Sequence, residues 1–427
     1  MHVEPWLPRA AALRPGSIAV EASGERLSYS ELLDRAARGA GALGACGIGP
    51  GARVALTAEA GLNFAVGLHA CLLAGAVAVP IDPRLPASER ERRRAGAPLL
   101  ARADLVAGTL AAPMARLSGD AALVVHTSGT TGTAREVVIT HGNILANALG
   151  SAVALGLDPS ERWLCPLPLA HIGGLMVLLR SAIYATTAVL APAPQAPAAI
   201  ARQLEGDVTI ASLVPTVLRR VLDAGPLPPR RLRAILLGGA PADRDLLRRA
   251  ADAGYPVVQT YGLTEACSQV TVSAPGDLDS CGRALPGVSV TLAGDGEIVV
   301  AGPTVAVPSG MVKTGDLGRL DAAGRLRVLG RRDEMIVTGG ENVAPAEVEG
   351  VLLEHPAVSD AAVFGRKDPE WGQVVTAAVV LAPGTDTDSV RAFCRERLAP
   401  FQVPKSIAAV ASLPRTPSGK LLRRELS

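Results

Sequence analysis

Apolar and polar positions along the first part of the chain alternate between a strand pattern and a helix pattern. Short apolar runs are followed by segments of about 10 to 15 residues whose apolar positions recur at helical spacing. Strands that alternate with helices build βαβ units, so the pattern predicts mostly parallel sheets with both faces covered. The predicted strands are 53–60, 76–81, 122–128, 233–239 and 256–262, and the predicted helices are 28–46, 61–75, 141–153 and 243–254.

The pattern changes after about residue 285. The segments VSVTLAG, GEIVVAG and GRLRVLG alternate apolar and polar residues between glycines and aspartates, which predicts antiparallel hairpins. From residue 333 the order strand, glycine turn, helix, strand predicts a compact α+β unit of about 95 residues. We therefore expect an α/β fold. A large N-terminal domain of mostly parallel βαβ sheets plus a small β-barrel-like region would span 1–330, and a small α+β C-terminal domain would span 333–427.

Composition indicates a globular protein but does not identify a ligand. The chain has 48% hydrophobic and 19% charged residues, which supplies apolar surface for a large core and argues against disorder. Lysine and arginine total 42 against 40 acidic residues, and a net charge of +2 gives no reason to expect a nucleic-acid or membrane partner. The apolar stretch 64–80 is shorter than the ~20 residues of a membrane span.

The cysteines and the N-terminus favour a reducing compartment. The six cysteines are scattered, with no C-x-x-C pair and no Cys/His cluster, so we expect buried, reduced thiols. The first residues, MHVEPWLPRA, contain Glu4 and two prolines before any apolar run, unlike a signal peptide. These features predict a cytoplasmic protein and leave open whether it forms a homo-oligomer.

Lysine is scarce in this chain, because almost every other cation is arginine. The base composition of the gene is a sufficient cause of that bias. Lysine is nevertheless a compact, flexible point charge and arginine a planar fork, so a site that needs an ammonium cannot simply take a guanidinium. The four lysines are Lys313, Lys367, Lys405 and Lys420.

A loop rich in glycine and hydroxyl side chains follows the predicted strand 122–128. Its N–H groups and hydroxyls are suited to cradle phosphate oxygens, and it lacks the G-x-x-x-x-G-K-[ST] pattern of nucleotide hydrolases. The string HTSGTTGTAREVVITHGN resembles the phosphate loop of the acyl-adenylate-forming superfamily, which includes acyl-CoA synthetases, luciferases and the adenylation domains of peptide synthetases. The residues of the loop are Thr127, Ser128, Gly129, Thr130, Thr131 and Gly132.

Further motifs of this superfamily recur in order from about residue 26 to the end of the chain. They are ILLGGAPA, TYGLTE, KTGDLGRL, GRRDEMIVTGGENVAPAEVE and PRTPSGKLLRREL. The last of these motifs places the superfamily's catalytic lysine at Lys420. The other binding residues that the resemblance implies are Arg135, Gly238, Gly239, Ala240, Thr260, Tyr261, Gly262, Asp316, Arg331, Gly339 and Gly340.

The chemistry implied by the resemblance joins a carboxylate to the α-phosphate of ATP, so cations are needed where these anions meet. Lys420 can reach both groups as a mobile ammonium. Thr264 and Glu265 of the TYGLTE motif are catalytic candidates with Lys420 and His171. Glu265 is expected to hold Mg²⁺ because hard carboxylate oxygens suit this ion. Asp316 can accept hydrogen bonds from the ribose hydroxyls, and the Tyr261 ring offers a stacking face for adenine.

The resemblance also implies a mobile C-terminal domain and a second step. The domain turns about a hinge at 331–333 between a pose in which Lys420 enters the site and a pose in which the Gly339–Gly340 loop lines a tunnel for a thiol. The segment VFGRKDPEWGQVV resembles the CoA-ligase branch. The expected cofactors are ATP, Mg²⁺ and coenzyme A, and the expected partner is a small carboxylic acid.

The phosphate loop ends differently from the superfamily pattern T-G-x-P-K-G. Arg135 stands at the lysine position and keeps the positive charge, whereas Glu136 stands at the final glycine position. Glu136 adds an anion near the phosphates. It would either weaken ATP binding or point to solvent.

Two groups of sequence segments indicate which carboxylic acid is the substrate. PLPLAHIGGLMVLL places His171 where the superfamily lines its acyl pocket, and 214–216 and 267–269 should form other walls. LPLAHIGGL and QTYGLTEACSQV resemble the o-succinylbenzoate-CoA ligase branch, which serves menaquinone biosynthesis. Its acid carries a second, aromatic carboxylate, which Ser268, Thr260 or a bound water could meet. Another acyl- or aryl-CoA ligase, or a non-catalytic adenylate-binding relative suggested by Glu136, remain as alternatives.

Overall fold

A nine-stranded sheet organises the largest part of the chain in the computed structural model, which describes residues 1–100, 116–127, 135–191, 196–225, 229–415 and 421–426. Its strand order is β15-β14-β13-β12-β11-β9-β10-β2-β3. The strands from β13 to β2 are parallel, and antiparallel β14, β15 and β3 form the two edges. The strands are β2 Ile18–Ala22, β3 Glu25–Ser28, β9 Arg162–Cys165, β10 Thr187–Leu190, β11 Ile210–Leu213, β12 Ala234–Leu237, β13 Val257–Leu263, β14 Ser268–Val272 and β15 Arg283–Ala284.

Both faces of this sheet are buried, as the sequence pattern predicts. Along β9, Trp163 and Cys165 enter one apolar cluster together with residues of α2, α3, α5 and α6, whereas Leu164 enters a second cluster with residues of α7, α8 and α9. Successive strand residues point to opposite faces, so each face has its own helical cover. The helices are α1 Trp6–Leu13, α2 Tyr29–Ala45, α3 Leu62–Ala74, α5 His141–Leu155, α6 Ile172–Tyr184, α7 Pro197–Glu205, α8 Pro215–Asp223 and α9 Arg244–Asp252.

Local sequence signals set several helix ends. Helix α2 begins at a capping box in which the Ser28 hydroxyl accepts from the Glu31 backbone N–H while the Glu31 carboxylate accepts from the Ser28 backbone. Helix α3 ends at Gly75, whose φ of 73° is left-handed. No helix in the described parts of the chain is long and apolar enough to cross a membrane.

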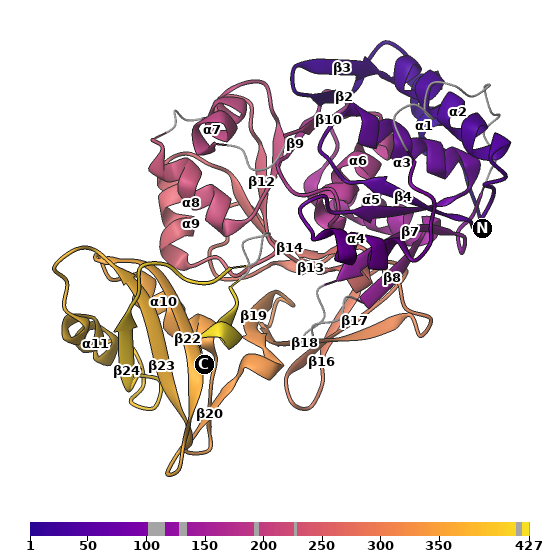
Figure 1. Cartoon of the computed structure of the whole chain (residues 1–427). Coiled ribbons are helices and arrows are strands. Elements are labelled where there is room, and N and C mark those ends of the chain that lie inside the picture. The colour runs from indigo at the N-terminus through magenta and orange to yellow at the C-terminus, as the bar shows by residue number, and fades with distance from the viewer. Residues whose placement is uncertain (101–115, 128–134, 192–195, 226–228, 416–420, 427) are drawn as a thin grey trace.

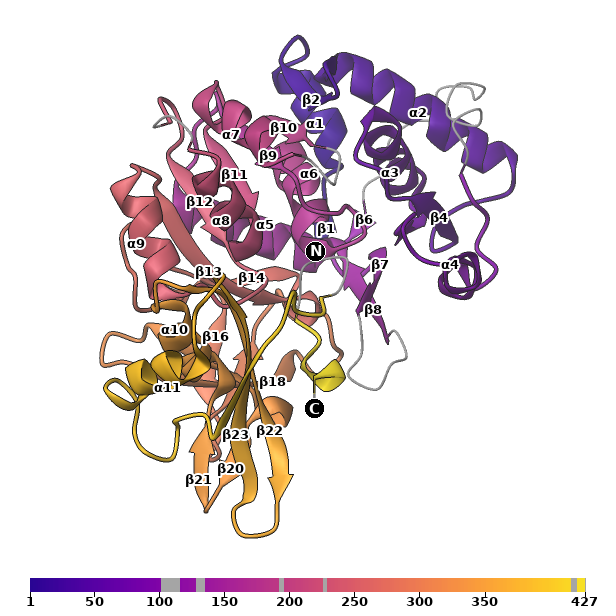
Figure 2. The same ribbon diagram turned by 60° about the vertical axis from the view of Figure 1, so that its left-hand side comes forward.

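A second sheet contains β4 Arg53–Thr57, β5 Val77–Ile81, β7 Ala121–Thr127 and β8 Arg135–Thr140, in that order. Strands β4, β5 and β7 are parallel, and β8 returns antiparallel to β7. Strand β8 was not predicted, because the sequence pattern leads from the glycine-rich segment directly to the helix that begins at His141. The loop at 128–134 therefore joins two paired strands. Short β1 His2–Val3 pairs with β6 Arg116–Leu117 outside these sheets, and α4 Ala87–Arg94 projects from the molecule (Figure 2).

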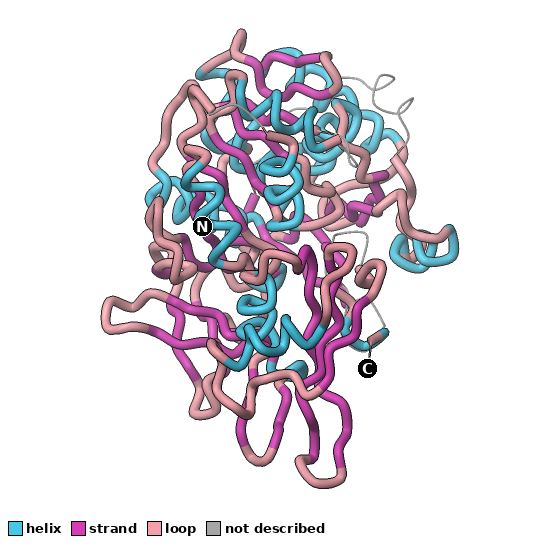
Figure 3. The backbone as a smooth tube through the Cα atoms, turned by 90° about the vertical axis from the view of Figure 1, so that its left-hand side faces the viewer, coloured by secondary structure: helices cyan, strands magenta, loops and turns pink. Residues whose placement is uncertain are grey.

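Antiparallel strands follow, as expected. They are β16 Ser289–Leu292, β17 Glu297–Ala301, β18 Met311–Leu320 and β19 Leu326–Arg331, which form one four-stranded sheet. The C-terminal part combines β20 Ile336–Thr338, β21 Glu341–Val343, β22 Val358–Asp368, β23 Gly372–Leu381 and β24 Ser406–Ala409 with α10 Pro345–Leu353 and α11 Thr387–Arg395. It has its own apolar cluster, and it lies below α8 and α9 in Figure 1. In Figure 3 most helical turns occupy the upper part of the molecule and long hairpins the lower part.

The cysteine prediction is confirmed in part. All six thiols are free, and Cys71, Cys165, Cys267 and Cys394 are buried. Cys46 is exposed, which contradicts the expectation of burial, because it lies just beyond the last residue of α2.

Candidate active site

Three predicted nucleotide-binding residues from separate motifs meet between β13, β18 and β19. The Tyr261 hydroxyl donates to Asp316 Oδ2 at 2.7 Å, and Arg331 Nη1 donates to Asp316 Oδ1 at 3.1 Å. Asp316 and Arg331 are opposite each other in the antiparallel pair β18–β19. The carboxylate is thus oriented through both of its oxygens.

The surroundings of Tyr261 and Arg331 keep both side chains protonated. Burial and the adjacent Asp316 carboxylate both raise the pKa of Tyr261, so its phenol stays a donor at neutral pH. Burial lowers the pKa of Arg331, but the nearby carboxylates of Asp316 and Asp333 outweigh this and raise it overall. The group therefore presents an oriented carboxylate beside a permanent cation, which suits a ribose and a phosphate.

Glycines allow close backbone approach at the ends of β12 and β13. A Cβ on Gly238 would lie 2.8 Å from the Thr260 carbonyl oxygen, and a Cβ on Gly262 would lie 2.0 Å from the Ser268 carbonyl oxygen. Gly239 has a φ of 79°, and Gly239 and Ala240 are exposed. These positions bring exposed backbone to the carboxyl edge of the parallel sheet, where ligands of α/β folds bind.

Thr264 and Glu265 lie in a single 3₁₀ turn, η2 Thr264–Ala266. The Glu265 carbonyl oxygen accepts from the Ala306 N–H at 2.7 Å, which fixes the turn, and the residue is half-buried. Within the described ranges no three His, Cys, Asp or Glu side chains could hold a metal by themselves. One carboxylate fits Mg²⁺, because protein sites for this ion commonly supply one or two carboxylates and leave the remaining positions to phosphates and water.

The two strands that flank the phosphate loop are in register. Thr127 is opposite Arg135, and the Thr127 hydroxyl donates to the Arg135 carbonyl oxygen at 3.5 Å. Arg135 is exposed. The other predicted loop residues, Ser128, Gly129, Thr130, Thr131 and Gly132, lie outside the described residues, as does Lys420.

Glu136 is exposed, as one of the two expectations had it, and its carboxylate also has a counterion. Its carboxylate pairs with Arg53, with Nη1 donating at 3.0 Å and a second contact of 2.9 Å from Nη2. Buried His126 lies 3.7 Å from the same carboxylate. The residue that breaks the superfamily pattern therefore has a counterion on β4, and its charge is offset before any phosphate binds.

His171 and the Gly339–Gly340 loop lie on other elements. His171 is exposed at the N-cap of α6, and a Cβ on the following Gly174 would lie 2.7 Å from the Pro168 carbonyl oxygen. In the C-terminal part Gly339 has a φ of 58° and its N–H donates to the Trp371 carbonyl oxygen at 2.9 Å. Among the described residues no hydrogen bond or ion pair joins His171, Gly339 or Gly340 to the Tyr261 group.

Sequence reasoning missed Arg180, a fully buried arginine in the middle of α6. Its Nη2 donates to Asn147 Oδ1 at 2.5 Å, and its guanidinium lies 5.5 Å from the centre of the Trp163 ring. Its Nε has no hydrogen-bond partner among the described residues. No acidic side chain pairs with it in the described part of the chain. Burial lowers its pKa from the usual value, against weaker opposite effects of Tyr184 and Cys267. The sequence signal was a lone cation inside the apolar run IGGLMVLLRSAIY.

The chain is similar to known proteins over nearly its whole length. Residues 7–97 and 94–307 match the AMP-binding enzyme family, and 347–420 match the AMP-binding enzyme C-terminal domain. The chain is 37% identical to a 2-succinylbenzoate–CoA ligase of Bacillus licheniformis, over 99% of this chain and 98% of that protein, and 36% identical to one of Bacillus cereus, over 99% and 97%.

Solved structures of o-succinylbenzoate CoA synthetase (MenE) from Bacillus subtilis share the fold. The complex with the acyl-adenylate OSB-AMP is 33% identical with a TM-score of 0.92 and covers 100% of this chain and 98% of that one. The complex with ATP and a magnesium ion is 33% identical with a TM-score of 0.90 and covers 100% of both chains. The predicted α/β fold is confirmed, and the chain belongs to the AMP-binding enzyme family.

Proposed function

We propose that this chain is an ATP-dependent acid–CoA ligase that activates o-succinylbenzoate through an acyl-adenylate. The Bacillus ligases support the proposal, because their similarity extends over nearly the whole of both chains. The Tyr261, Asp316 and Arg331 group supports nucleotide binding by its geometry. The free thiols and the lack of a membrane-spanning helix among the described residues are compatible with a cytoplasmic location, which is part of the proposal.

Arg180 is the observation that carries the choice of acid. A buried cation without an anion is costly, and the cost falls when a bound carboxylate supplies the missing charge and hydrogen bonds. o-Succinylbenzoate has two carboxylates, so one can be activated while the aromatic one remains to meet a cation. Cys267, in the segment that directly follows the TYGLTE motif, lies close enough to Arg180 to affect its pKa. The Cys267 thiol also lies 3.9 Å from the Met176 sulfur of α6, so the segment that carries Glu265 packs against the helix that carries Arg180.

Beside Arg180, buried Gln269 leaves both its side-chain oxygen and nitrogen without a partner among the described residues. Asn147 connects the two, because its Oδ1 accepts from Arg180 and its Nδ2 donates to the Gln269 carbonyl oxygen at 2.8 Å. Such unmet polar groups favour a polar ligand and disfavour an apolar acyl chain. This supports an aromatic dicarboxylate over the fatty-acid alternative.

The proposed reaction has two steps. In the first, an oxygen of the succinyl carboxylate attacks the α-phosphorus of ATP and the bond to pyrophosphate breaks. Lys420 offsets the charge that develops there, Asp316 and Arg331 hold the nucleotide, and Glu265 would hold Mg²⁺, which would neutralise phosphate charge. In the second, the thiol of coenzyme A, after losing its proton, attacks the acyl carbonyl carbon and AMP leaves.

We assign the two steps to two positions of the C-terminal part. The proposed domains are 1–330 and 333–427, with the hinge at 331–333. Lys420 serves the first step, and the Gly339–Gly340 loop serves the second by lining the thiol path. His171 is proposed to border the acyl site. Gly238, Gly239 and Ala240, which follow β12, are proposed to border the adenine site.

A panel of acids tests the function. Purified protein with ATP, Mg²⁺ and o-succinylbenzoate should release pyrophosphate, and coenzyme A should then yield the thioester and AMP. No pyrophosphate with any acid would overturn the enzyme proposal and favour a non-catalytic relative. Turnover of fatty or simple benzoic acids without o-succinylbenzoate would overturn only the substrate.

A further inference from the structure

The residues on the two sides of 416–420 are held together by contacts that the structure describes. Arg415, before the segment, and Leu421, after it, form an antiparallel bridge. Arg415 Nη2 also donates to both carboxylate oxygens of Asp360, at 2.7 and 3.0 Å, which ties this bridge to β22. Residues 416–420 thus connect two chain positions that are held together.

Arg423 makes a second and stronger attachment three residues after Lys420. Its Nε and Nη2 donate to Glu349 of α10 at distances from 2.7 to 3.1 Å, and its Nη1 donates to Glu334 at 2.5 Å. Glu349 also accepts from the Val363 N–H of β22 at 2.8 Å. Side-chain exposure is only 17% for Arg423 and 12% for Glu349, so water screens this pair less than a surface pair.

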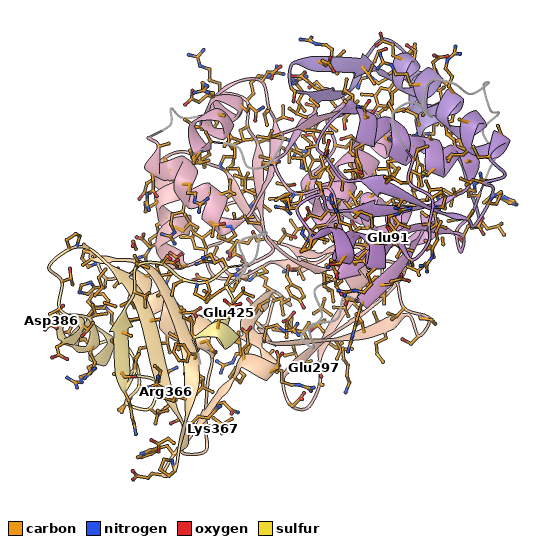
Figure 4. All side chains as sticks on the ribbon, in the orientation of Figure 1. Glu91, Glu297, Arg366, Lys367, Asp386 and Glu425 are labelled. Atoms are coloured by element: carbon orange, nitrogen blue, oxygen red, sulfur yellow. The ribbon has the colours of Figure 1, made fainter. Side chains whose placement is uncertain are left out.

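Glu334, the second acidic partner of Arg423, connects this attachment to the proposed hinge. It lies in the turn η3 Arg332–Glu334, which the proposed mechanism uses as its hinge. On the other side of the same turn, Arg332 Nη1 donates to buried Glu297 at 3.0 Å, and Glu297 accepts in turn from the Gly315 N–H at 2.9 Å. Figure 4 labels Glu297 in the region of the sheet β16–β19, to the right of the C-terminal part. Arg332, before Asp333, is therefore bonded to the N-terminal part, and Glu334, after Asp333, is bonded to the C-terminal part.

We propose that Arg423 is a positioning residue for adenylation, which ties the Lys420 segment to α10 and to the C-terminal arm of the hinge. The inference rests on the proposed function, in which Lys420 acts at the α-phosphate. Because three residues span about 10 Å at most, a fixed Arg423 restricts where Lys420 can be placed. When the C-terminal part turns about Asp333, Glu334, Arg423 and the bridge between Arg415 and Leu421 move as one unit.

The test separates the two half-reactions in Arg423→Met. We expect kcat for pyrophosphate formation to fall about 100-fold with the KM for ATP little changed, since a small misplacement of a catalytic group costs that much. Thioester formation from supplied acyl-adenylate should stay within about threefold. Arg423→Lys should restore part of the lost rate, because an ammonium keeps one of the two acidic contacts.

Two further variants decide between positioning and general damage. In a Lys420→Ala background, Arg423→Met should cause no additional loss of adenylation, because both changes then remove the same contribution. Glu349→Gln with Arg423→Met removes both charges and avoids a buried unpaired carboxylate, so it should fold and show the same adenylation defect. The matched control is Arg391→Met, which breaks the Arg391–Asp388 pair on α11 and should leave both half-reactions unchanged.

Equal loss of both half-reactions in the folded double variant, or an additional loss in the Lys420→Ala background, would overturn the inference. So would unchanged adenylation in Arg423→Met. Unmodified protein that forms no pyrophosphate would instead overturn the proposed function, and the two failures are thereby distinguishable.

Discussion

The Tyr261 hydroxyl donates a 2.7 Å hydrogen bond to Asp316 Oδ2, and this bond joins two motifs that are 55 residues apart. Among the described side chains, Arg331 is the other donor to the Asp316 carboxylate, at 3.1 Å. Two fixed donors on a carboxylate restrict its rotation and leave its remaining lone pairs for the ribose hydroxyls. Tyr261 thus has a role beyond the stacking face that the sequence predicts.

Tyr261→Phe should weaken ATP binding more than it slows the chemical step. It removes one hydrogen bond to a charged group, worth about 1.5 kcal/mol, so the KM for ATP should rise about tenfold with kcat within about threefold. Pyrophosphate release measured against ATP concentration gives both constants. Tyr255→Phe is the matched control, since the Tyr255 hydroxyl is buried without a hydrogen-bond partner among the described residues. An equal rise in both variants would contradict the assignment.

The ion pair between Arg53 and Glu136 predicts that substitutions of its two members affect the KM for ATP differently. Glu136→Gln should leave the KM for ATP within about twofold, because Arg53 already offsets the carboxylate in the unmodified protein. Arg53→Gln leaves an unpaired anion beside the phosphate loop, so the KM for ATP should rise about threefold at low salt and recover at high salt. The control is Arg38→Gln, which breaks the exposed Arg38–Asp34 pair on α2. A larger defect in Glu136→Gln than in Arg53→Gln would show that Glu136 has a direct role.

The parts of the fold that depend on local signals could be predicted. The capping box of Ser28 and Glu31 fixes the start of α2, and alternating apolar runs give the parallel strands. Strand β8 was missed because its six residues are half exposed and follow a glycine loop, so pairing with β7 defines it rather than its own pattern. Pairing with β7, rather than local sequence preference, therefore determines that residues 135–140 form a strand.

The site likewise contains residues that sequence motifs identify and contacts that only the tertiary structure reveals. Motif positions such as Tyr261 and Asp316 could be identified one by one, but the bond between them could not. Glu136 meets Arg53 across 83 residues of sequence, and nothing local indicates a counterion. Arg180 was missed because a single cation in an apolar helix has no motif around it, although the cost of burying it was a usable signal.

Arg180→Met should change which acids the protein prefers. The kcat/KM for o-succinylbenzoate should fall about 100-fold, which corresponds to the ~3 kcal/mol of a hydrogen-bonded, charged contact. The value for 4-oxo-4-phenylbutanoate, which lacks the aromatic carboxylate, should change by less than about threefold. The methionine fills a similar apolar space, so stability should be retained or increased. Equal losses for the two acids would assign Arg180 a structural role only.

Buried histidines should make stability fall as the pH falls below about 6.5. Burial lowers the pKa of His69 from 6.5 to about 4, and burial together with Arg116 lowers that of His141 to about 4. Between these pH values the unfolded chain binds protons that the folded chain does not, so each histidine costs about 1.4 kcal/mol for each pH unit. The free energy of unfolding should therefore decline from pH 6.5 to 4, in addition to any contribution from carboxylates.

His69→Leu isolates one of these contributions. The variant removes one titrating group from the apolar helix α3, so the slope of unfolding free energy against pH between 6.5 and 4 should decrease by about 1.4 kcal/mol per unit. Urea unfolding at a series of pH values measures that slope. His2→Gln, a substitution of the same residue type at an exposed position, is the matched control. An unchanged slope in His69→Leu would mean that His69 binds its proton equally well in the folded and unfolded chains.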